Sequence, residues 1–498
     1  MFETELKFQV PAAQLAAVRR ALATQTARTT RLRAQYFDTA DRRLAAAGLA
    51  LRLRHEGRRW VQTLKAGGDG SLHRLEHEVA LPAARGVPRL DIARHVGTPA
   101  GDALALALGD GPRELLALFE TDVRRTQRRV RMAGASIELA LDLGVICAGD
   151  AQVPLCEIEF ELLSGPLAGL LALASTWADR HALWLDMRSK AERGDMLARG
   201  LRANPPTVAQ APDLSADMST DAALRAMVRT CLAQVLPNIA ALAADCGEAE
   251  HLHQARIGLR RLDTALREFG DWSPAVDAAW RSRLKHCFAP LGPARDADAI
   301  TEWLQPALLA AEAPWIEPAL DAEREALAAV LRKPDVTRLM LTLMAFAYAA
   351  DLVPAQTAVA RAPQELARQA TLCLARLHGR IVKDGSRFVE LDDAARHRTR
   401  RRLKRLRYAL EFFALLLPGK PLRRFVAQLR PAQDALGRLN DAALAEAAFR
   451  RQLESEPRAW FALGWLAAQR AQWAKDAAAA LARLGNAKPG WPQRHGKH

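Results

Sequence analysis

Charged side chains stand at every second position in several short segments of the first 200 residues. The first segment, Glu3-Thr-Glu5-Leu-Lys7, places two carboxylates and one ammonium on one face of a strand, because residues two apart in a strand share a face. Leu6 and Phe8 take the opposite face. The same alternation recurs at Arg52 and Arg54, at Arg74, Glu76 and Glu78, at Glu138 and Asp142, and at Glu157, Glu159 and Glu161.

Two arrangements would account for this alternation. In an ordinary sheet the apolar residues face the core and the charges face water, which explains any single segment. The whole set favours a closed barrel with a charged lumen, because solvated faces usually mix Ser and Thr among their charges, whereas these faces are nearly all Arg, Lys, Glu or Asp. Helices would then cover the apolar outer face of the barrel.

A lumen of this composition suits a divalent metal and a phosphate chain together. Clustered carboxylates repel one another unless a hard cation such as Mg²⁺ or Mn²⁺, which prefers oxygen ligands, binds among them. Rows of Arg and Lys neutralise phosphate, and Arg can bind its oxygens in bidentate fashion. The pattern therefore predicts metal-assisted phosphoryl hydrolysis.

These residues belong to a chain of 498 residues, of which 50% are hydrophobic and 26% are charged. Such a chain is long enough for two or three domains, and a disordered protein is excluded. Lys and Arg number 71 against 56 Asp and Glu, so the formal net charge is +15. This surplus points to a polyanionic partner such as nucleic acid, acidic lipid or polyphosphate.

Three features of the sequence indicate the cellular compartment: the cysteine spacing, the hydropathy and the N-terminal residues. The six cysteines form no C-x-x-C pair and no cluster with zinc-ligand spacing, which argues for a reducing compartment and against structural zinc. The longest apolar run, residues 339–350, falls short of the roughly 20 residues that a spanning helix needs. The charged N-terminal residues are unlike a secretory signal. We therefore expect a cytoplasmic protein with no membrane partner.

Turn chemistry and helical periodicity divide the chain into two domains. Short alternating segments predict antiparallel β-structure in residues 1–202, with outer helices around residues 12–23, 99–118 and 166–181. A Pro-rich segment, residues 203–216, predicts a linker. Ala, Leu and Arg with a 3.6-residue period predict an all-helical domain over residues 217–485 and a tail at 486–498. The fold class is α+β, with an antiparallel β-barrel tunnel followed by an all-α bundle.

One motif occurs twice in the helical domain. It has the form His-x-x-Arg-x-x-x-Arg/Lys-Arg-Leu, and each copy is followed by Leu-Gly-x-x-Arg/Asn-Asp, at residues 291–296 and 436–441. A duplicated bundle with pseudo-twofold symmetry is the simplest explanation, and it would bring the two basic helices face to face. The stripe residues of the two copies are His253, Arg256 and Arg260, and His397, Arg400 and Lys404.

These stripes predict a surface for an anion. A solvated basic face is the ordinary explanation for such a run of charge, but the duplicated spacing and the separate apolar stripe of Leu262, Leu266 and Phe269 favour binding. Aromatic residues that could stack on bases are scarce beside the stripes, so we expect a polyanion without bases and no specific nucleic acid. The copies are not equivalent, since Glu411 stands where the first copy has Arg267.

Nine blocks in the first 194 residues resemble the CYTH superfamily, the triphosphate tunnel metalloenzymes. Glu3-x-Glu5-x-Lys7 is similar to the E-x-E-x-K signature of that family, and eight further blocks follow in the usual order. They are Tyr36–Thr39, Leu51–Arg54, Gln62–Lys65, Arg74–Glu78, Phe119–Arg125, Ala140–Gly144, Glu157–Leu162 and Ser189–Gly194. Residues 218–485 resemble a CHAD domain, through the two copies of the motif and Arg295-Asp296. The fusion is similar to bacterial inorganic triphosphatases.

The resemblance implies roles for the charged residues. The metal ligands, for Mg²⁺ or Mn²⁺, would be Glu3, Glu5, Glu159 and Glu161. The phosphate chain would be held by Lys7, Arg52, Arg54, Lys65, Arg74, Arg125 and Lys190. The carboxylates that orient these cations or bind a second metal would be Glu76, Glu78, Glu138, Asp142 and Glu157. CHAD domains are associated with polyphosphate, which implies this partner for the helical domain.

Three functions stay open from the sequence. The leading hypothesis is metal-dependent hydrolysis of inorganic triphosphate (tripolyphosphate). The second is a polyphosphate-binding protein with little turnover that localises on polyphosphate granules. The third is a tunnel enzyme that acts on an organic triphosphate, as an ATP cyclase or a thiamine triphosphatase.

Overall fold

The computed structural model describes residues 2–67, 72–82, 86–111, 113–316, 325–349, 365–417 and 419–491. The chain forms two compact units, defined by their internal contacts. The first comprises residues 1–207, 233–255 and 328–353, and the second comprises residues 208–232, 256–327 and 354–498. The domain limits expected at residues 202 and 217 stay a prediction, because each unit defined by contacts takes in more than one stretch of chain.

A closed antiparallel barrel forms the core of the first unit. The strands follow one another around it in the order β5-β4-β3-β2-β6-β7-β8-β1, and a pairing between β1 and β5 closes the ring. A short strand, β9 (Trp184–Leu185), also pairs with β1. The barrel strands are β1 (Phe2–Gln9), β2 (Arg28–Asp38), β3 (Ala50–Glu56), β4 (Arg59–Gly67), β5 (His73–Leu81), β6 (Leu116–Met132), β7 (Ala135–Ala148) and β8 (Ala151–Ser164). The expected barrel is confirmed.

Strand β1 carries the Glu-x-Glu-x-Lys segment and closes the barrel. Its first residues pair with β5, where Glu3 stands opposite Arg74. The following residues pair with β8, where Glu5 stands opposite Glu161, and Lys7 opposite Glu159. This register places the charges of β1, β5 and β8 on the same inner face, because directly opposed residues of paired strands share a face.

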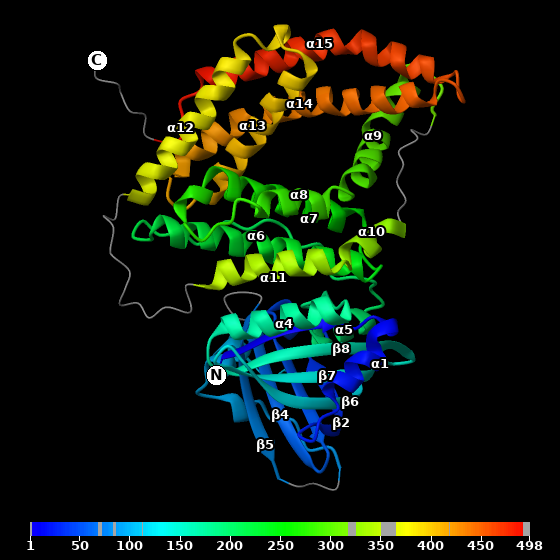
Figure 1. Ribbon diagram of the computed structural model, residues 1–498, viewed down its shortest axis with the longest axis vertical. Helices are drawn as coiled ribbons and strands as arrows, with labels where there is room; N and C mark the ends of the chain where they lie inside the picture. Colours follow the sequence, from blue (N-terminus) through cyan, green and yellow to red (C-terminus); the bar gives the residue numbers. More distant parts are fainter. Residues whose placement is uncertain are drawn as a thin grey trace. The chain divides into compact units, whose positions relative to one another are not determined.

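Helices cover the apolar outer face of the barrel (Figure 1). Helix α4 (Leu167–His181) packs on β6, β7 and β8, and its Trp177 ring meets the Phe160 ring edge to face at 5.9 Å. Helix α1 (Leu15–Leu22) contacts β6. Helices α2 (Arg43–Ala46) and α3 (Pro99–Leu108) form a second core with β3 and β4, around Leu51 and Leu64. The helix expected over residues 99–118 is shorter, because Gly109 adopts a φ of +66° and ends it, and β6 begins seven residues later.

Helix α5 (Lys190–Ala198) fills part of the barrel interior. It begins at a capping box, in which the Ser189 and Glu192 side chains each accept a hydrogen bond from the other residue's backbone N–H. Its apolar side packs on inward-facing residues of the barrel wall, among them Tyr36 and Phe119. Gly194 permits this contact, since a Cβ there would lie 2.1 Å from the Phe119 ring. The interior is therefore apolar beside α5 and charged beyond its N-terminus.

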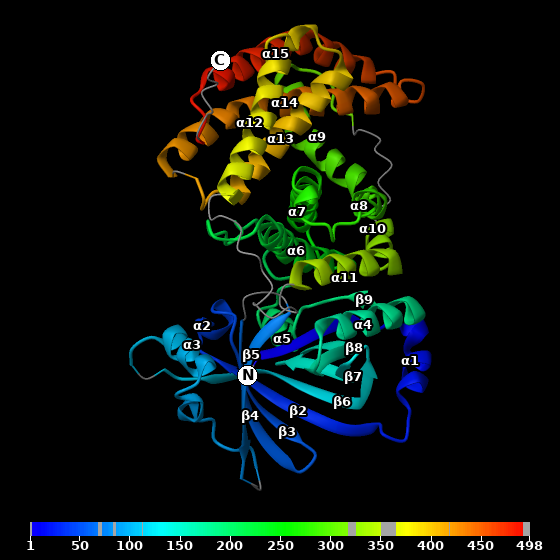
Figure 2. The same cartoon turned by 60° about the vertical axis from the view of Figure 1, so that its left-hand side comes forward.

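From residue 208 onward, the regular structure of the described residues is helical, as expected. The helices are α6 (Thr220–Ala243), α7 (Ala249–Glu268), α8 (Trp280–Phe288), α9 (Leu291–Ala310), α10 (Glu325–Leu331), α11 (Pro334–Tyr348), α12 (Glu365–Gly385), α13 (Asp393–Phe412), α14 (Gly419–Gln452) and α15 (Ala459–Asn486). Within the second unit, α12, α13, α14 and α15 lie side by side (Figure 2). A core of α9, α14 and α15 includes Leu304, Phe449 and Leu466.

Helix α6 is the one described helix that is long and apolar enough to cross a membrane. Its most apolar window is 72% buried inside the protein. A buried apolar helix of this kind is also what the core of a folded domain requires, and we read α6 as a core helix.

The two copies of the repeated motif lie on α7 and α13. Their apolar stripes are buried, and the equivalent residues Phe269 and Phe413 meet edge to face, with ring centroids 5.3 Å apart. A contact between equivalent residues is what a twofold axis produces where it passes between them. The pseudo-twofold symmetry of the whole bundle stays a prediction.

Candidate active site and basic cavity

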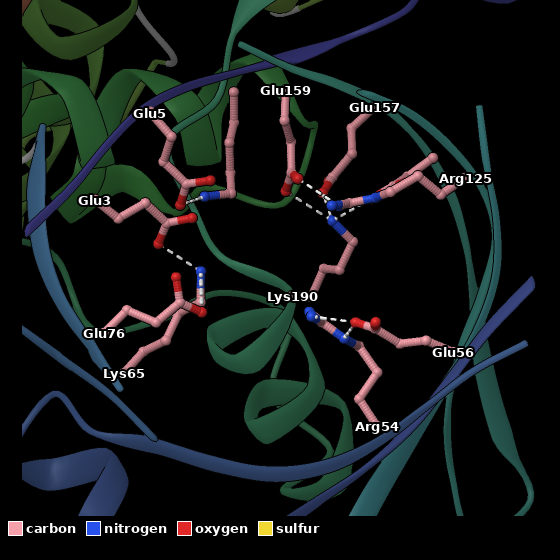
Figure 3. A network of polar contacts seen from close by, with 12 residues as sticks. Glu3, Glu5, Arg54, Glu56, Lys65, Glu76, Arg125, Glu157, Glu159 and Lys190 are labelled. Atoms are coloured by element: carbon pink, nitrogen blue, oxygen red, sulfur yellow. Dashed lines mark hydrogen bonds and ion pairs between the residues drawn. The ribbon is translucent and has the colours of Figure 1, made fainter. Parts of the chain in front are cut away.

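The barrel encloses a cavity of about 1240 Å³ lined by charged side chains. Figure 3 shows them pointing inward from the surrounding strands and from the start of α5. Of the residues predicted for metal and phosphate, all those named as metal ligands and phosphate-binding cations line this cavity. Asp142 and Glu157 are not part of its lining and instead bind lining cations from the wall. This position fits the orienting role expected for them, which stays a prediction.

The tightest group of carboxylates surrounds Lys190. Oxygen atoms of Asp142, Glu157 and Glu159 lie within 4.8 Å of one another. The Lys190 Nζ lies 2.6 Å from Asp142 and Glu157 and 2.8 Å from Glu159. Burial alone would lower the pKa of Lys190, but these carboxylates raise it well above its usual value. A permanent ammonium therefore occupies the place that three clustered carboxylates would otherwise offer to a metal ion.

Arg125 binds the same group from β6. Its Nε and Nη2 donate to the two oxygens of Asp142 at 2.8 and 2.6 Å, and Nη2 also donates to Glu159 at 2.5 Å. Asp142 is fully buried in the middle of β7. Although burial would raise the pKa of Glu159, Lys190 and Arg125 hold it well below its usual range.

Two lysines neutralise the carboxylates of β1. Lys7 forms an ion pair with Glu5, and Lys65 donates to Glu3 at 2.5 Å and lies 3.3 Å from Glu76. Burial would raise the pKa of Glu5, but Lys7 and Lys65 lower it to about 2. The pKa of Glu3, in contrast, is raised, because burial and the nearby Glu5 and Glu76 outweigh its lysines.

Glu161 lies beside this group without a close cation. It forms no ion pair with any described residue, and burial together with Glu3 and Glu138 raises its pKa to about 7. Carboxylates that repel one another in this way are the electrostatic condition for a divalent cation site. The structure thus places Glu161, which pairs with no described cation, beside Glu3, whose pKa is raised although Lys65 binds it.

The opposite imbalance exists around Arg54. Its guanidinium pairs with Glu56 and lies 3.0 Å from Glu78. Its pKa is nevertheless lowered, through burial and through the charges of Arg52 and Arg125. Arg52 donates to the Tyr36 hydroxyl at 3.2 Å. Arg52 and Arg125 differ from Arg54, because neighbouring groups raise the pKa of each: Tyr36 and Glu76 beside Arg52, and Asp142 and Glu159 beside Arg125.

Several interacting residues were not predicted. Glu56 continues the alternation of Arg52 and Arg54, and extending that pattern by one step would have found it. Arg193 lies 2.8 Å from Glu157, but it comes from α5, where no strand pattern identifies it. Among the predicted cations, Arg74 lies near the start of α5, 3.7 Å from Glu192.

The second unit contains a cavity of about 920 Å³ that is lined mostly by Arg and Lys, and we call it the basic cavity. Arg256 and Arg260 of α7 line it, as do His397, Arg400 and Lys404 of α13, so the two basic helices do share one site. His253, predicted for the same surface, is not part of its lining. The other cations that line it are Arg267, Arg281, Lys285, Arg376, Arg380, Arg398, Arg401, Arg402 and Arg405.

Two carboxylates in this lining are already neutralised. Glu268 is bound by Arg405 at 2.8 Å and by Arg376 at 3.2 Å. Asp263 lies 3.1 Å from Arg281. Among the residues that line the basic cavity, cations therefore far outnumber carboxylates, which is the condition for binding an external polyanion.

The Leu-Gly-x-x-Asn-Asp sequence after the second copy supports the cations of α13. His397 Nδ1 lies 2.9 Å from the side-chain oxygen of Asn440, and Arg400 lies 3.8 Å from Asp441. In the second copy the trailing sequence therefore contacts the stripe residues of the motif. The corresponding side chains of the first copy, at residues 292–299, lie outside the described part of the chain.

Comparison with known proteins agrees with both halves of this description. The CYTH domain model matches residues 1–194, and the CHAD domain model matches residues 226–451. An inorganic triphosphatase of Haemophilus influenzae is 32% identical over 166 residues, which are 32% of this chain and 44% of that protein. The chain thus matches less than half the length of that relative.

Two solved structures are also similar. The CHAD domain of the plant Ricinus communis has 32% sequence identity and a TM-score of 0.49, and covers 57% of this chain and 98% of its own. A putative adenylyl cyclase from Hippeastrum, whose description gives it a dominant triphosphatase activity, has 17% identity and a TM-score of 0.28. That comparison covers 40% of this chain and 96% of the other.

Proposed function

Because the chain carries a CYTH domain followed by a CHAD domain, we propose that its barrel hydrolyses inorganic triphosphate with Mg²⁺ or Mn²⁺ and that its basic cavity binds polyphosphate. The observation that supports the first part best is the composition of the lumen, where carboxylates and cations line one cavity. Glu161, which pairs with no described cation, suits a divalent cation, and the arginines and lysines of the same lining suit a phosphate chain.

The residues present fit a divalent metal. Glu161 has no ion-pair partner among the described residues, and the pKa of Glu3 is raised although Lys65 binds it, so these two are our first choice as ligands. Glu5 and Glu159 complete the proposed set, although each is bound to a cation of the wall, so they would have to share their oxygens with it. A bound Mg²⁺ or Mn²⁺ would neutralise phosphate oxygens and lower the pKa of a water ligand.

The arginines and lysines of the lumen would hold and align the phosphate chain. Arg54 would gain from a bound anion, since burial and the charges of Arg52 and Arg125 lower its pKa. Arg125 is held rigidly by two bonds to Asp142, which orients its guanidinium before substrate enters. Fixed donors of this kind stabilise the charge that develops on phosphate oxygens without reorganising during the reaction.

Helix α5, which fills part of the barrel interior, would separate part of the lumen from water. Its packing on Phe119 and Tyr36 encloses the Lys190 ammonium, whose bonds to three carboxylates keep it charged. Lys190 would then present a fixed positive charge beside Glu159. The remaining open volume is large enough for a triphosphate, and no stacking pocket for a base is needed for an inorganic substrate.

The test is phosphate release from tripolyphosphate with Mg²⁺ or Mn²⁺, compared with release from ATP and from thiamine triphosphate. We expect metal-dependent release from tripolyphosphate, abolished by Glu161→Gln, and polyphosphate binding that this variant retains. Faster turnover of an organic triphosphate would move the assignment to a nucleotide or thiamine substrate. Binding of polyphosphate by well-folded protein with no release from any of the three would leave a binding protein.

A further inference from the structure

The basic cavity holds a lysine where the other copy of the repeat has an arginine. Lys404 of α13 occupies the motif position that Arg260 occupies in α7. The exchange matters, because an arginine keeps its charge at any pH at which proteins fold, whereas a lysine loses its proton readily when it is buried among cations. Among the motif residues of the two copies that line the cavity, Lys404 is the one lysine.

Lys404 is half-buried and faces cations from two helices. Arg400 of its own helix and Arg260 of α7 line the same cavity as Lys404. The carboxylate whose charge acts on Lys404 is Asp441 of α14, which lies 3.8 Å from Arg400. Among the described residues Lys404 forms no ion pair, while the adjacent Arg405 is bound to Glu268 at 2.8 Å.

These surroundings make a charged ammonium costly in the empty cavity. Burial, Arg400 and Arg260 lower the pKa of Lys404 to about 6, and Asp441 offsets only part of this effect. His397, which also lines the cavity, has a lowered pKa for the same reason, burial first. At neutral pH the site therefore contains an amine that is ready to accept a proton as soon as negative charge arrives beside it.

We propose that Lys404 is a proton-accepting subsite of the basic cavity, uncharged when the cavity is empty and protonated when a phosphate chain binds, so that acidification strengthens binding. This inference rests on the proposed binding of polyphosphate in that cavity. It goes further in assigning to one residue a coupling between phosphate binding and proton uptake. Arg260, its counterpart in the repeat, contributes charge without such coupling.

Linkage gives the sign and size of the effect. Above the pKa of the free amine, binding must take up a proton, so affinity falls as pH rises, by up to about tenfold per pH unit while the proton is fully coupled. Ionisation of the terminal phosphates acts in the opposite direction, because it adds negative charge as pH rises. A variant with a permanent cation at position 404 measures the effect of phosphate ionisation by itself.

Lys404→Arg is that variant, and it makes the two copies of the motif alike. Binding of inorganic polyphosphate to the full chain would be measured by titration calorimetry between about pH 7 and about pH 8.5, with chelator present to prevent turnover. Repeating each titration in two buffers of different ionisation enthalpy gives the number of protons taken up. We expect the wild-type protein to take up close to one proton more than Lys404→Arg, whose affinity also falls less with pH.

A second measurement needs no variant. Trace labelling with acetic anhydride, followed by peptide mass spectrometry, compares the reactivity of each lysine, and only the neutral amine reacts. We expect Lys404 to react faster than the exposed Lys475 at neutral pH and to be protected by polyphosphate.

Equal proton uptake by both proteins, or labelling of Lys404 no faster than Lys475, would overturn the inference while leaving polyphosphate binding intact. Absence of binding by either protein at every pH would overturn the proposed binding function and this inference with it. The two failures are therefore distinguishable.

Discussion

The Lys190 Nζ lies 2.8 Å from Glu159 Oε1, and both groups face the lumen of the barrel. The contact joins the first residue of α5 to strand β8. It means that the carboxylate cluster with the closest spacing is filled by the protein's own cation, and that the acidic residues left for a metal are those nearer Glu3 and Glu161.

Removing this ammonium tests whether it substitutes for a metal. In Lys190→Met, three carboxylates within 4.8 Å of one another lose their shared partner. We expect the free energy of unfolding to fall by roughly 3–5 kcal/mol, as when one partner of a buried ion pair is removed. We also expect Mn²⁺ to raise the melting temperature of the variant more than that of the wild type, since the vacated cluster can then bind the cation.

Denaturation with and without Mn²⁺ measures both effects. Lys475→Met, at an exposed position of α15, is the matched control and should change neither quantity. An equal response of Lys190→Met and wild type to Mn²⁺ would show that the cluster does not accept a metal even when its lysine is gone.

Arg125 offers a test of bidentate binding within the lumen. Lysine cannot reproduce the two parallel bonds that Arg125 makes to Asp142, nor donate at the same time to Glu159. We expect Arg125→Lys to lower kcat for tripolyphosphate by about 10²-fold, the scale seen when one fixed donor to a developing charge is lost.

Arg193→Lys is the control for this experiment. Arg193 also pairs with a buried carboxylate, Glu157, but it does not line the cavity. Steady-state kinetics should show a small effect of this second variant. If both variants lose activity equally, the role of Arg125 is to hold the fold and not to bind phosphate.

The fold and the site could be predicted to different extents. The period-two alternation predicted which residues face the lumen, since a strand has only two faces and the apolar one must be covered. It could not predict that Lys190 and Arg193 enter the network, because both come from a helix whose position depends on the packing of Gly194 against Phe119. The pairings among charged residues likewise depend on barrel closure, which joins β1 to β5 across 70 residues of chain.

The raised pKa of Glu161 predicts that the free energy of unfolding depends on pH when no metal is bound. Its pKa is raised to about 7, so the folded protein holds a proton that the unfolded chain releases near pH 4.5. Stability must therefore fall as pH rises between these values, and the full penalty is present above pH 7. Glu161→Gln removes the charge, and we expect it to stabilise the metal-free protein at pH 8 by about 1–2 kcal/mol, after allowance for partial exposure.

Denaturant unfolding at about pH 5 and about pH 8 in chelator measures this difference. At pH 5 the carboxyl is protonated in the folded state, so wild type and variant should differ little. A variant that is no more stable than wild type at pH 8 would mean that Glu161 is already neutralised without metal. With saturating Mg²⁺ the order should reverse, because the variant lacks a proposed ligand.

The contact between Phe269 and Phe413 predicts coupling between the two copies of the repeat. Both side chains are fully buried, and their rings meet edge to face at 5.3 Å. Each single change to Ala should cost about 3–5 kcal/mol of unfolding free energy, as for other buried aromatic residues. Leu would retain more of the packing, so Phe269→Leu and Phe413→Leu keep the protein folded for a double-mutant cycle. We expect a coupling energy of about 0.5–1.5 kcal/mol between them, the range measured for aromatic pairs.

Phe449 supplies the control, because it is equally buried but belongs to the core of α9, α14 and α15. The effects of Phe269→Leu and Phe449→Leu should be additive within about 0.5 kcal/mol. Additivity of Phe269 and Phe413 as well would show that the two basic helices are stabilised independently, each by its own half of the bundle.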